Sequence, residues 1–334
     1  MGASDRVLLE IKDLVKYYPI YSRGILLKKQ LGVVHAVDGV SLNIGQGENL
    51  GLVGESGCGK TTLGKTLMYL ELPLSGEVIY DGIKMFDAFS SKDAEKIRRI
   101  RRGIQMVFQN PYTSLDPRMT VYDILSEPYI IHKHVPRGEW KDNVYELLRM
   151  VNLEEYHAER YPHEFSGGQR QRISIARALA VDPRLIVADE PVSSLDVSIR
   201  AQILNLLMDL QREKGLSYLY ISHDLSSVRQ ITNRVAVMYL GKIFELSKTD
   251  ELYSKPLNPY TQALLSAVPI PDPERNRMKI ILPGEVPSAV IPPSGCRFHP
   301  RCSHAAEICR NEEPPLREIL PEHFAACHYA EKFL

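Results

Sequence analysis

Apolar and polar residues alternate in short runs through the first 53 positions of the chain. The runs at residues 7–11, 33–37 and 40–44 have the two-residue period of half-buried strands, and a turn leads from them into an apolar run at 50–53. Residues 20–32 form a basic stretch between the first two runs, which we interpret as a flexible hairpin insertion. The pattern therefore predicts a β-rich N-terminal region.

Later in the chain, short apolar runs alternate with segments of helical periodicity. Residues 140–151 repeat apolar positions at i, i+4, i+7, i+8 and i+11, and further helices are predicted after Ser166 and after Asp196. Residues 235–245 have the pattern of a closing hairpin. Strands that alternate with helices predict an α/β fold with a parallel sheet. The runs typical of buried strands lie at residues 104–108, 185–188 and 219–222.

A glycine-rich loop follows the β-rich region and precedes a segment with Leu63, Leu67 and Leu70 on one predicted helix face. Glycines let the backbone curl so that its N–H groups point at a compact anion, and the helix N-terminus adds partial positive charge. This context predicts a phosphate-binding loop in which Lys60 reaches the β- and γ-phosphates and Thr61 binds Mg²⁺. The loop residues are Gly54, Glu55, Ser56, Gly57, Cys58, Gly59, Lys60, Thr61 and Thr62.

Polar side chains follow the three predicted buried strands at their carboxyl ends, where open α/β sheets bind ligands. Gln109 can offer an amide oxygen to Mg²⁺ or to an attacking water, and Asp189 can hold Mg²⁺ through water. Glu190 can act as a general base, and His223 can contact a γ-phosphate oxygen. A lone Gln or His at such a position is also typical of a structural residue.

Two predicted helices begin after residues that cap helices well. Ser166 and Asp196 each precede a helix, and N-capping alone would account for both. Gly167 and Gly168, followed by Gln169, would also let an anion approach the helix start closely. Tyr18 lies before the phosphate loop and either packs in the core or stacks on an adenine ring. The local sequence leaves both interpretations open.

The composition is that of an ordinary soluble protein. Of its 334 residues 44% are hydrophobic and 25% charged, and the formal net charge is zero, which argues against a general nucleic-acid-binding surface. The arginines within residues 90–102 are interpreted as a solvated helix face. No apolar run approaches the roughly 18 residues of a membrane span, and the N-terminus has no signal-peptide core, so we expect the chain to stay in the cytosol.

Taken together, the residues from 7 to about 250 resemble the ATP-binding cassette (ABC) family. Phe165 stands where many cassettes have Leu, and Thr61 stands where Ser is commoner. The resemblance implies a P-loop NTPase (RecA-like) α/β core with an antiparallel β subdomain and a helical insertion at about 111–165, together spanning residues 1–255. Residues 54–61 are similar to the Walker A motif and residues 185–190 to Walker B. Gln109 is similar to the Q-loop glutamine, Ser166–Gln169 to the signature motif and Ser194–Asp196 to the D-loop. His223 is similar to the switch histidine, and Tyr18 to the adenine-stacking aromatic.

The resemblance also implies an ATPase that works as a pair of cassettes. Walker A of one chain and the signature helix of the other would sandwich each ATP, with Asp196 coupling the two sites, and hydrolysis would open the pair. The implied partners are a second, related ATPase subunit, two membrane permease subunits and, indirectly, an extracytoplasmic binding protein, with no nucleic acid. The chain would lie peripherally on the cytoplasmic face of the cell membrane.

The C-terminal extension, residues 256–334, resembles the tail of oligopeptide/dipeptide importer ATPases. The similar segments are 258–265, 282–287 and 295–302. They imply import of peptides, or of nickel or another small ligand. A soluble cassette acting on nucleic acid or ribosomes is the alternative, although this chain has one cassette and no long coiled-coil arms. A catalytically idle module would not need the residues that match the Walker, Q-loop and switch motifs.

The extension contains four cysteines, and in a cytosolic protein they are not expected to form disulfides. Cys296, Cys302, Cys309 and Cys327 have five, six and seventeen residues between them. Four thiolates suggest a metal centre, and the lack of a C-x-x-C pair disfavours a zinc ribbon. The resemblance implies a 4Fe–4S cluster, while zinc or unligated thiols remain alternatives. The possible substitute ligands are His299, His304, His323 and His328.

Overall fold

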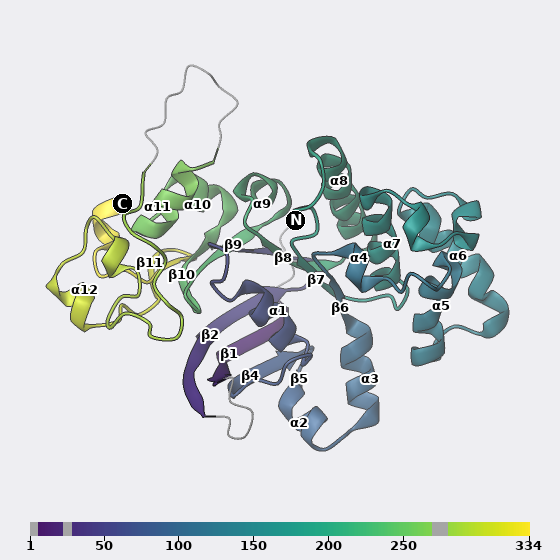
Figure 1. The fold of residues 1–334 in the computed structure, drawn as a ribbon, viewed down its shortest axis with the longest axis horizontal. Helices are drawn as coiled ribbons and strands as arrows, with labels where there is room; N and C mark the ends of the chain where they lie inside the picture. The colour runs from purple at the N-terminus through teal and green to yellow at the C-terminus, as the bar shows by residue number, and fades with distance from the viewer. Residues whose placement is uncertain (1–5, 23–28, 269–279) are drawn as a thin grey trace. The chain divides into compact units, whose positions relative to one another are not determined.

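The computed structural model describes residues 6–22, 29–268 and 280–334, which Figure 1 colours along the chain. Residues 23–28, which belong to the predicted hairpin insertion at 20–32, lie outside the described part. The chain divides into two compact units, each assembled from separate stretches of sequence. The first contains the residues up to Leu9, Ile44–Asn49 and Ile79–Ser222, and the second contains Glu10–Asn43, Leu50–Val78 and His223–Leu334.

A parallel sheet lies at the centre of the first unit. Its strands follow the order β8-β7-β6, and Leu185 pairs with Ile104 on one side and Ser217 on the other. All residues of β7 and β8 are buried, as predicted from their apolar sequences. The elements of this unit are β5 (Ile83–Lys84), α2 (Met85–Ser90), α3 (Ala94–Gly103), β6 (Ile104–Val107), α4 (Pro111–Ser114), α5 (Val121–His132), α6 (Trp140–Met150), α7 (Gly167–Leu179), β7 (Leu185–Asp189), α8 (Val197–Lys214) and β8 (Ser217–Ser222).

The region predicted as a helical insertion consists of helices and short 3-10 turns in the first unit. Helices α5, α6 and α7 pack against one another (Figure 1), and α6 buries Val144, Leu147 and Leu148 on the predicted face. Trp140, the first apolar position of the predicted repeat at 140–151, is half-buried at the start of α6, where its Nε1–H donates to the carbonyl oxygen of Val135 at 3.1 Å. The 3-10 turns lie at Arg137–Glu139, Glu155–Glu159 and Pro162–Glu164.

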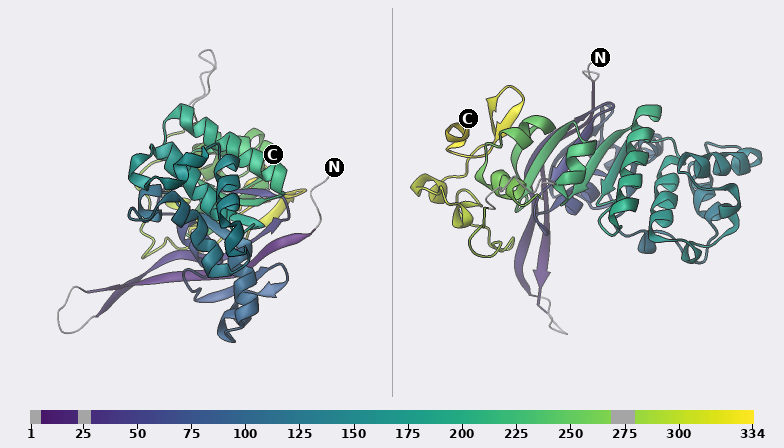
Figure 2. Two further views of the ribbon diagram at one scale, coloured as in Figure 1. Left: turned by 90° about the vertical axis from the view of Figure 1, so that its right-hand side faces the viewer. Right: turned by 90° about the horizontal axis from the view of Figure 1, so that it is seen from above.

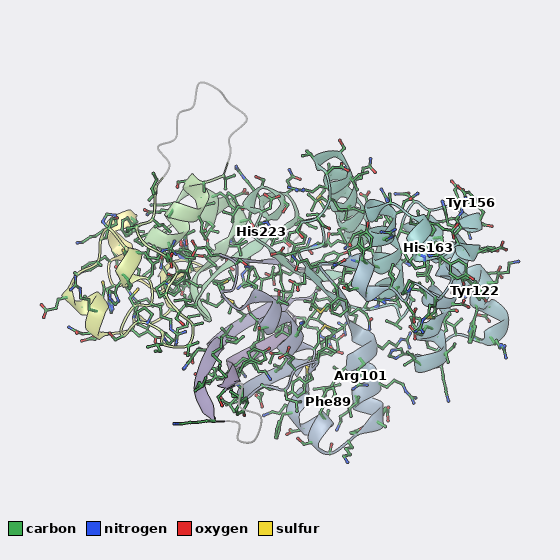
Figure 3. The ribbon with its side chains drawn as sticks, in the orientation of Figure 1. Phe89, Arg101, Tyr122, Tyr156, His163 and His223 are labelled. Carbon is green, nitrogen blue, oxygen red and sulfur yellow. The ribbon has the colours of Figure 1, made fainter. Side chains whose placement is uncertain are left out.

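The arginine-rich segment forms helix α3. Asp93 caps its N-terminus by accepting from the backbone N–H of Lys96, and Arg98, Arg99 and Arg101 are exposed. The guanidinium of Arg101 lies 5.8 Å from the ring centroid of Phe89 in the neighbouring helix α2 (Figure 3). The segment is therefore a solvated helix, as its sequence pattern indicated.

A nearly buried carboxylate joins three separate parts of the first unit. The side chain of Asp81 is 3% exposed, and its oxygens accept from Arg6 at 2.7 Å, from Arg184 at 2.9 Å and from Arg99. Burial by itself would raise the pKa of Asp81, but the hydrogen bonds from Arg99 and Arg184 hold this pKa below its ordinary value. The carboxylate therefore remains charged and anchors all three guanidinium groups.

We expect Asp81→Asn to lower the free energy of unfolding by about 2 kcal/mol at neutral pH, because the amide no longer balances the three cations. The lowered pKa of Asp81 means that its ion pairs stabilise the fold above the unfolded-state pKa, about 4, and lose that contribution as the pH falls through the folded-state pKa. Urea unfolding at pH 7 and at pH 3 should therefore show a smaller difference between wild type and variant at pH 3. An equal difference at both pH values would contradict this role.

The second unit is built on a mixed sheet. Its strands follow the order β11-β12-β10-β9-β3; β3 and β9 are parallel, and each of the other pairs is antiparallel. The unit also contains the ribbon of β1 and β2, which run side by side (Figure 2). The elements are β1 (Val7–Tyr21), β2 (Gln30–Gly45), β3 (Asn49–Val53), α1 (Lys60–Leu67), β4 (Ser75–Tyr80), α9 (Leu225–Ile231), β9 (Arg234–Tyr239), β10 (Lys242–Lys248), α10 (Thr249–Ser254), α11 (Pro259–Ser266), α12 (Glu307–Asn311), β11 (Arg317–Leu320) and β12 (His323–Ala325), where β1, β2, β3 and β4 begin or end in the first unit.

The structure differs from two local predictions in the second unit, one on where a strand is divided and one on where a helix ends. The runs at 33–37 and 40–44 form one strand, β2, which continues through Gly39 because glycine tolerates its φ of 72°. Leu70 does not lie on the face of α1 with Leu63 and Leu67, and it is 56% exposed. The helix ends at Leu67, and the left-handed conformation of Tyr69, with φ of 54°, turns the chain away before Leu70.

A buried acid attaches the C-terminal extension to strand β10. Glu245 is fully buried and accepts from the backbone N–H of Leu257 at 2.6 Å, from that of Asn258 at 3.1 Å, and from Nε2 of His323 at 2.7 Å. Leu257 belongs to a small core with Ala325 and Ala330 from the extension. One carboxylate thus satisfies two backbone donors and one side-chain donor that would otherwise be buried unpaired.

We expect Glu245→Ala to destabilise the protein by about 3–5 kcal/mol, because it leaves these donors buried without an acceptor. Glu313→Ala is the matched control, since Glu313 pairs with Lys242 at 2.6 Å but is 51% exposed. Exposed pairs contribute at most about 1 kcal/mol. Chemical unfolding of both variants compares the two sites, and equal losses of stability would contradict the role of Glu245.

Among the described residues, none of the helices combines the length with the apolar character that a membrane crossing requires.

Candidate nucleotide-binding site

The predicted phosphate-binding loop connects the fully buried strand β3 to helix α1. Gly54, Gly57 and Gly59 all have positive φ, at 153°, 77° and 110°. A Cβ atom on Gly54 would lie 2.1 Å from the carbonyl oxygen of Met238, and one on Gly59 would lie 1.9 Å from that of Ala36. No other residue fits at positions 54 and 59, so the loop requires glycine for space as well as for conformation.

The Lys60 side chain folds back over this loop. Its ammonium donates to the carbonyl oxygens of Gly54 at 2.8 Å and Glu55 at 3.0 Å, and it lies 3.7 Å from Sγ of Cys58. Lys60 is 6% exposed, whereas Thr61 at the next position is exposed. Burial raises the pKa of the Cys58 thiol, although the nearby Lys60 acts to lower it. The loop thus holds a preorganised cation at the start of a helix, which is the arrangement that binds phosphate.

The C-terminal extension contacts the second residue of the loop. The two terminal guanidinium nitrogens of Arg301 donate to the Glu55 carboxylate, at 2.7 and 3.1 Å, and the backbone N–H of Glu55 donates to the Tyr260 hydroxyl at 2.9 Å. Arg301 also donates to the hydroxyl of Tyr239 at 3.4 Å. No local sequence pattern predicts these contacts, because Glu55 and Arg301 are 246 residues apart.

The first unit brings two predicted site residues together. Nε2 of Gln109, which follows β6, donates to the Glu190 carboxylate at 2.8 Å. Glu190 follows β7 with a φ of 46°, and its backbone N–H donates to the carbonyl oxygen of Ile221 at 2.9 Å. Asp189 is the last residue of β7 and is 3% exposed. The structure therefore places an amide and two acids at the carboxyl ends of neighbouring parallel strands, as the sequence predicted.

Ser166 and Asp196 are both helix caps. Ser166 and Gln169 form a capping box at the start of α7: Oγ of Ser166 accepts at 3.3 Å from Gln169, whose Oε1 accepts at 3.0 Å from Ser166. Asp196 accepts at 2.9 Å from the backbone N–H of Ile199 at the start of α8. A Cβ atom on Gly168 would lie 2.4 Å from Cγ2 of Ile199. Packing of α7 against α8 therefore requires a glycine at position 168, in addition to any role with an anion.

Two further predicted residues lie in the second unit. Tyr18 is half-buried in β1, its hydroxyl donates to Glu71, and Nζ of Lys16 lies 5.1 Å from its ring centroid. Burial and the hydrogen bond with Glu71 raise the pKa of Tyr18 to about 12. His223 is exposed (Figure 3) and lies between the end of strand β8 and Asp224, which caps helix α9. Tyr18 thus lies on a strand that precedes the phosphate loop in the sequence, and His223 lies at the carboxyl end of strand β8.

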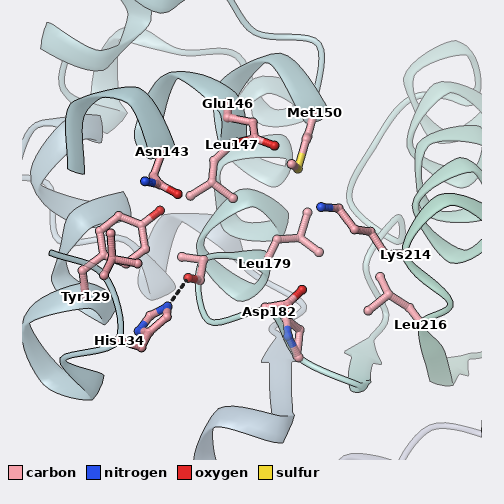
Figure 4. A pocket seen from close by; sticks show the side chains of 13 residues that line it. Tyr129, His134, Asn143, Glu146, Leu147, Met150, Leu179, Asp182, Lys214 and Leu216 are labelled. Atoms are coloured by element: carbon pink, nitrogen blue, oxygen red, sulfur yellow. Dashed lines mark hydrogen bonds between the residues drawn. The ribbon is translucent and has the colours of Figure 1, made fainter. Parts of the chain in front are cut away.

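A separate cavity of ≈ 180 Å³ lies among the helices of the first unit (Figure 4). Its lining includes Tyr129, Leu147, Met150 and Lys214, and Nε2 of His134 lies 3.0 Å from the carbonyl oxygen of Ala180 there. Burial lowers the pKa of His134. None of the lining residues belongs to the predicted nucleotide site, so we do not assign this cavity to nucleotide.

The four extension cysteines come from separate segments of the second unit. The backbone N–H of Cys296 donates to the carbonyl oxygen of Cys309 at 2.8 Å, and that of Tyr329 lies 3.4 Å from Sγ of Cys327. Among the described residues, no group of three or more Cys, His, Asp or Glu side chains has the spacing of a metal site.

The four histidines suggested as substitute ligands all make other contacts. His323 pairs with Glu245, and His299 lies with Nδ1 3.0 Å from the carbonyl oxygen of Cys296. Nε2 of His328 lies 2.9 Å from the carbonyl oxygen of Glu312, and the ring of His304 packs on Phe333.

A glycine-rich loop between a buried strand and a helix, with a lysine folded over it, defines a P-loop nucleotide-binding protein. Comparison with known families agrees. The profile of the family described as "ABC transporter" matches residues 37–193, and that described as "Oligopeptide/dipeptide transporter, C-terminal region" matches residues 244–309.

Relatives match this chain over nearly its whole length. The oligopeptide transport ATP-binding protein AppF of Bacillus subtilis is 51% identical and covers 98% of this chain and 98% of its own. The di/tripeptide transport ATP-binding protein DppF of Pseudomonas aeruginosa is 48% identical and covers 98% of this chain and 99% of its own. The chain belongs to the ABC transporter family, as one of its ATPases.

Solved structures support the cassette fold. The ATP-binding cassette MJ0796, in a dimeric post-hydrolysis state bound to ADP and Pi, matches with a TM-score of 0.62 and 32% identity, over 72% of this chain and 98% of its own. The chain cbiO1 from Clostridium perfringens, part of the transporter complex cbiONQ, matches with a TM-score of 0.62 and 26% identity, over 75% of this chain and 92% of its own. The predicted P-loop NTPase fold is therefore confirmed.

Proposed function

We propose that this chain hydrolyses ATP as a subunit of a peptide importer in the cell membrane. One observation carries the proposal: the similarity to ATP-binding proteins of oligopeptide and di/tripeptide transport covers 98% of the chain, including an extension of the matching type at 244–309. The core motifs alone would support only an ABC ATPase of unspecified substrate.

The proposed roles follow from the chemistry of the side chains. Lys60 and the loop residues Gly54–Thr62 bind the phosphates, and Thr61, Gln109 and Asp189 provide oxygen ligands of the kind that Mg²⁺ prefers. Glu190 takes a proton from the attacking water, and the Gln109 amide that now contacts its carboxylate keeps that carboxylate oriented. Tyr18 stacks on the adenine, and His223 contacts the γ-phosphate.

The working form in this proposal is a pair of cassettes. Ser166, Gly167, Gly168 and Gln169 of one chain face the ATP bound to the other, and Asp196 contacts the opposite site. The second cassette is a related ATPase subunit, and two membrane permeases receive the motion at the helical insertion. We place the chain peripherally on the cytoplasmic face of the membrane, with an extracytoplasmic peptide-binding protein as an indirect partner.

Purification of the tagged chain from detergent-solubilised membranes of its own cells tests this assembly. We expect two permeases and a related ATPase to co-purify, and cells that lack the chain to lose uptake of labelled di- or oligopeptides. Recovery with ribosomes or nucleic acid and without membrane proteins would contradict the transport role. If the permeases co-purify but cells that lack the chain still take up peptides, the transported substrate would instead be nickel or another small ligand.

We also propose that Cys296, Cys302, Cys309 and Cys327 hold a 4Fe–4S cluster. Four thiols are the donor set that such a cluster uses. Burial raises the pKa of Cys296 to about 12, so this thiol would have to lose its proton against that shift when it binds iron. The side chains would converge on binding and lose their protons. The bound group would cross-link a segment with little core of its own.

Anaerobic purification with assays for iron, acid-labile sulfide and zinc tests the cluster. We expect about four iron and four sulfide per chain, and loss of both in Cys309→Ser. Stoichiometric zinc without sulfide, or no metal at all, would contradict the proposal.

A further inference from the structure

Glu55, the second residue of the phosphate-binding loop, is bound from three directions. Its carbonyl oxygen accepts from Lys60 at 3.0 Å, its backbone N–H donates to Tyr260 at 2.9 Å, and its carboxylate accepts two hydrogen bonds from Arg301. All four residues belong to the second unit. The loop lysine and the residues that follow strand β10 therefore meet at one loop residue.

One peptide group transmits the position of Tyr260 to Lys60. The carbonyl of Gly54 and the N–H of Glu55 belong to the same planar peptide unit, so neither can rotate without the other. The Tyr260 hydroxyl binds the N–H side, and the Lys60 ammonium binds the carbonyl side at 2.8 Å. Fixing one side of this peptide therefore fixes the acceptor that holds the lysine.

The two side chains from outside the loop are themselves rigidly held. Tyr260 is fully buried among the rings of Tyr239, Phe244 and Phe298. Arg301 is 7% exposed and ends a 3-10 turn, His299–Arg301. The hydrogen bonds with Glu55 raise the pKa of Arg301 further above its ordinary value, so the guanidinium stays charged.

The segment that carries Arg301 is attached at a second point. Arg297 is also 7% exposed, and its guanidinium donates to the Asp38 carboxylate in β2 and to the carbonyl oxygen of Leu240. Oδ1 of Asp38 in turn accepts from the hydroxyl of Tyr17 at 2.5 Å. Two arginines four residues apart thus lock this segment onto the body of the unit, and Arg301 reaches Glu55 from a fixed base.

We propose that Arg301 and Tyr260 are positioning residues of the nucleotide-binding loop, which hold Glu55 and the 54–55 peptide in the conformation that presents Lys60 to phosphate. The C-terminal extension is then a part of the nucleotide site in function, although it contributes no atom to the nucleotide. This inference rests on the assignment of residues 54–62 as the phosphate-binding loop.

The test compares Arg301→Gln, Arg301→Lys and Glu55→Gln in the full chain by equilibrium binding of Mg·ATP. We expect Arg301→Gln and Glu55→Gln each to raise Kd about tenfold, equivalent to about 1.4 kcal/mol. The double variant should be no weaker than either single one, because both remove the same interaction. Arg301→Lys should recover part of the loss, since it restores the charge without the two-pronged geometry.

Arg317→Gln is the matched control. Arg317 makes the same two-pronged pair with Glu331, at 2.5 and 2.8 Å, within the extension and away from the loop. We expect this variant to bind Mg·ATP as wild type does. If Arg317→Gln weakens binding as much as Arg301→Gln, the effect is a general loss of extension structure and the proposal is overturned.

Hydrogen exchange without nucleotide gives a second readout that does not depend on binding. Tyr260→Phe keeps the buried ring and removes only the hydroxyl that Glu55 donates to. We expect faster exchange of the amides at residues 54–60 in both Tyr260→Phe and Arg301→Gln, with unchanged exchange in strand β9. If the amides at 54–60 exchange at the wild-type rate in both variants, the inference is overturned. This readout can be used even if Arg301→Gln is too unstable for binding measurements.

The two proposals fail in different ways. A wild-type chain that binds no Mg·ATP, even with its partner subunits, would remove the proposed function. A wild-type chain that binds Mg·ATP while Arg301→Gln, Glu55→Gln and Tyr260→Phe bind it equally well would remove only the role of the extension.

Discussion

Lys60→Ala is expected to raise the Kd for Mg·ATP by a factor of about 100 or more. The buried ammonium is held over the loop by the carbonyl oxygens of Gly54 and Glu55, so it is oriented before the nucleotide arrives. Loss of a desolvated charge that pairs with phosphate costs about 2–5 kcal/mol. Equilibrium binding of a fluorescent ATP analogue to the purified chain measures the change.

Lys65→Ala provides the control for this experiment. Lys65 lies in the last turn of the same helix, α1, and is not one of the predicted phosphate contacts. We expect this variant to bind Mg·ATP with the wild-type affinity. A Lys60→Ala chain that retains the wild-type affinity would show that the loop binds its ligand without this lysine.

Glu190→Gln is expected to preserve ATP binding and to slow hydrolysis about 1,000-fold, within the range that general-base catalysis contributes. The amide keeps the size of the side chain and can still accept from Gln109, but it cannot take a proton from water. ATP should then persist, and the pair of cassettes should accumulate in its closed form. Single-turnover phosphate release and light scattering with Mg·ATP measure the two effects.

Glu213→Gln, on the exposed side of helix α8, is the control and should release phosphate at the wild-type rate. Unchanged phosphate release in Glu190→Gln would exclude Glu190 as the base. The transport assignment would survive that result, because it depends on the whole-length similarity and not on this residue.

The local parts of the site could be predicted from the sequence because short-range physics determines them. Glycine is the only residue type that fits the backbone conformation and the space at positions 54 and 59. A helix also has to begin at Lys60 for the loop to bind an anion. Likewise, an apolar run such as 185–188 has to be a buried strand, so the acids that follow it have to lie at a sheet edge.

Errors in the prediction arose where one residue decided the course of the chain. Leu70 fits the helical period of Leu63 and Leu67, but the left-handed Tyr69 ends that period before it. The runs at 33–37 and 40–44 are separate in the sequence pattern, yet both belong to the single strand β2, which passes through Gly39. Periodicity reports the average preference of a segment, and a single backbone angle can override it.

The sequence by itself determined the phosphate-binding loop, the strand-end acids, the helix caps and the α/β class, because each depends on neighbours within a few residues. Only the tertiary structure decided that Gln109 contacts Glu190, that Glu245 anchors the C-terminal extension, and that Arg301 and Tyr260 bind the loop at Glu55. These contacts join residues 12 to 246 positions apart. Their partners are chosen by the packing of whole elements, which no local pattern encodes.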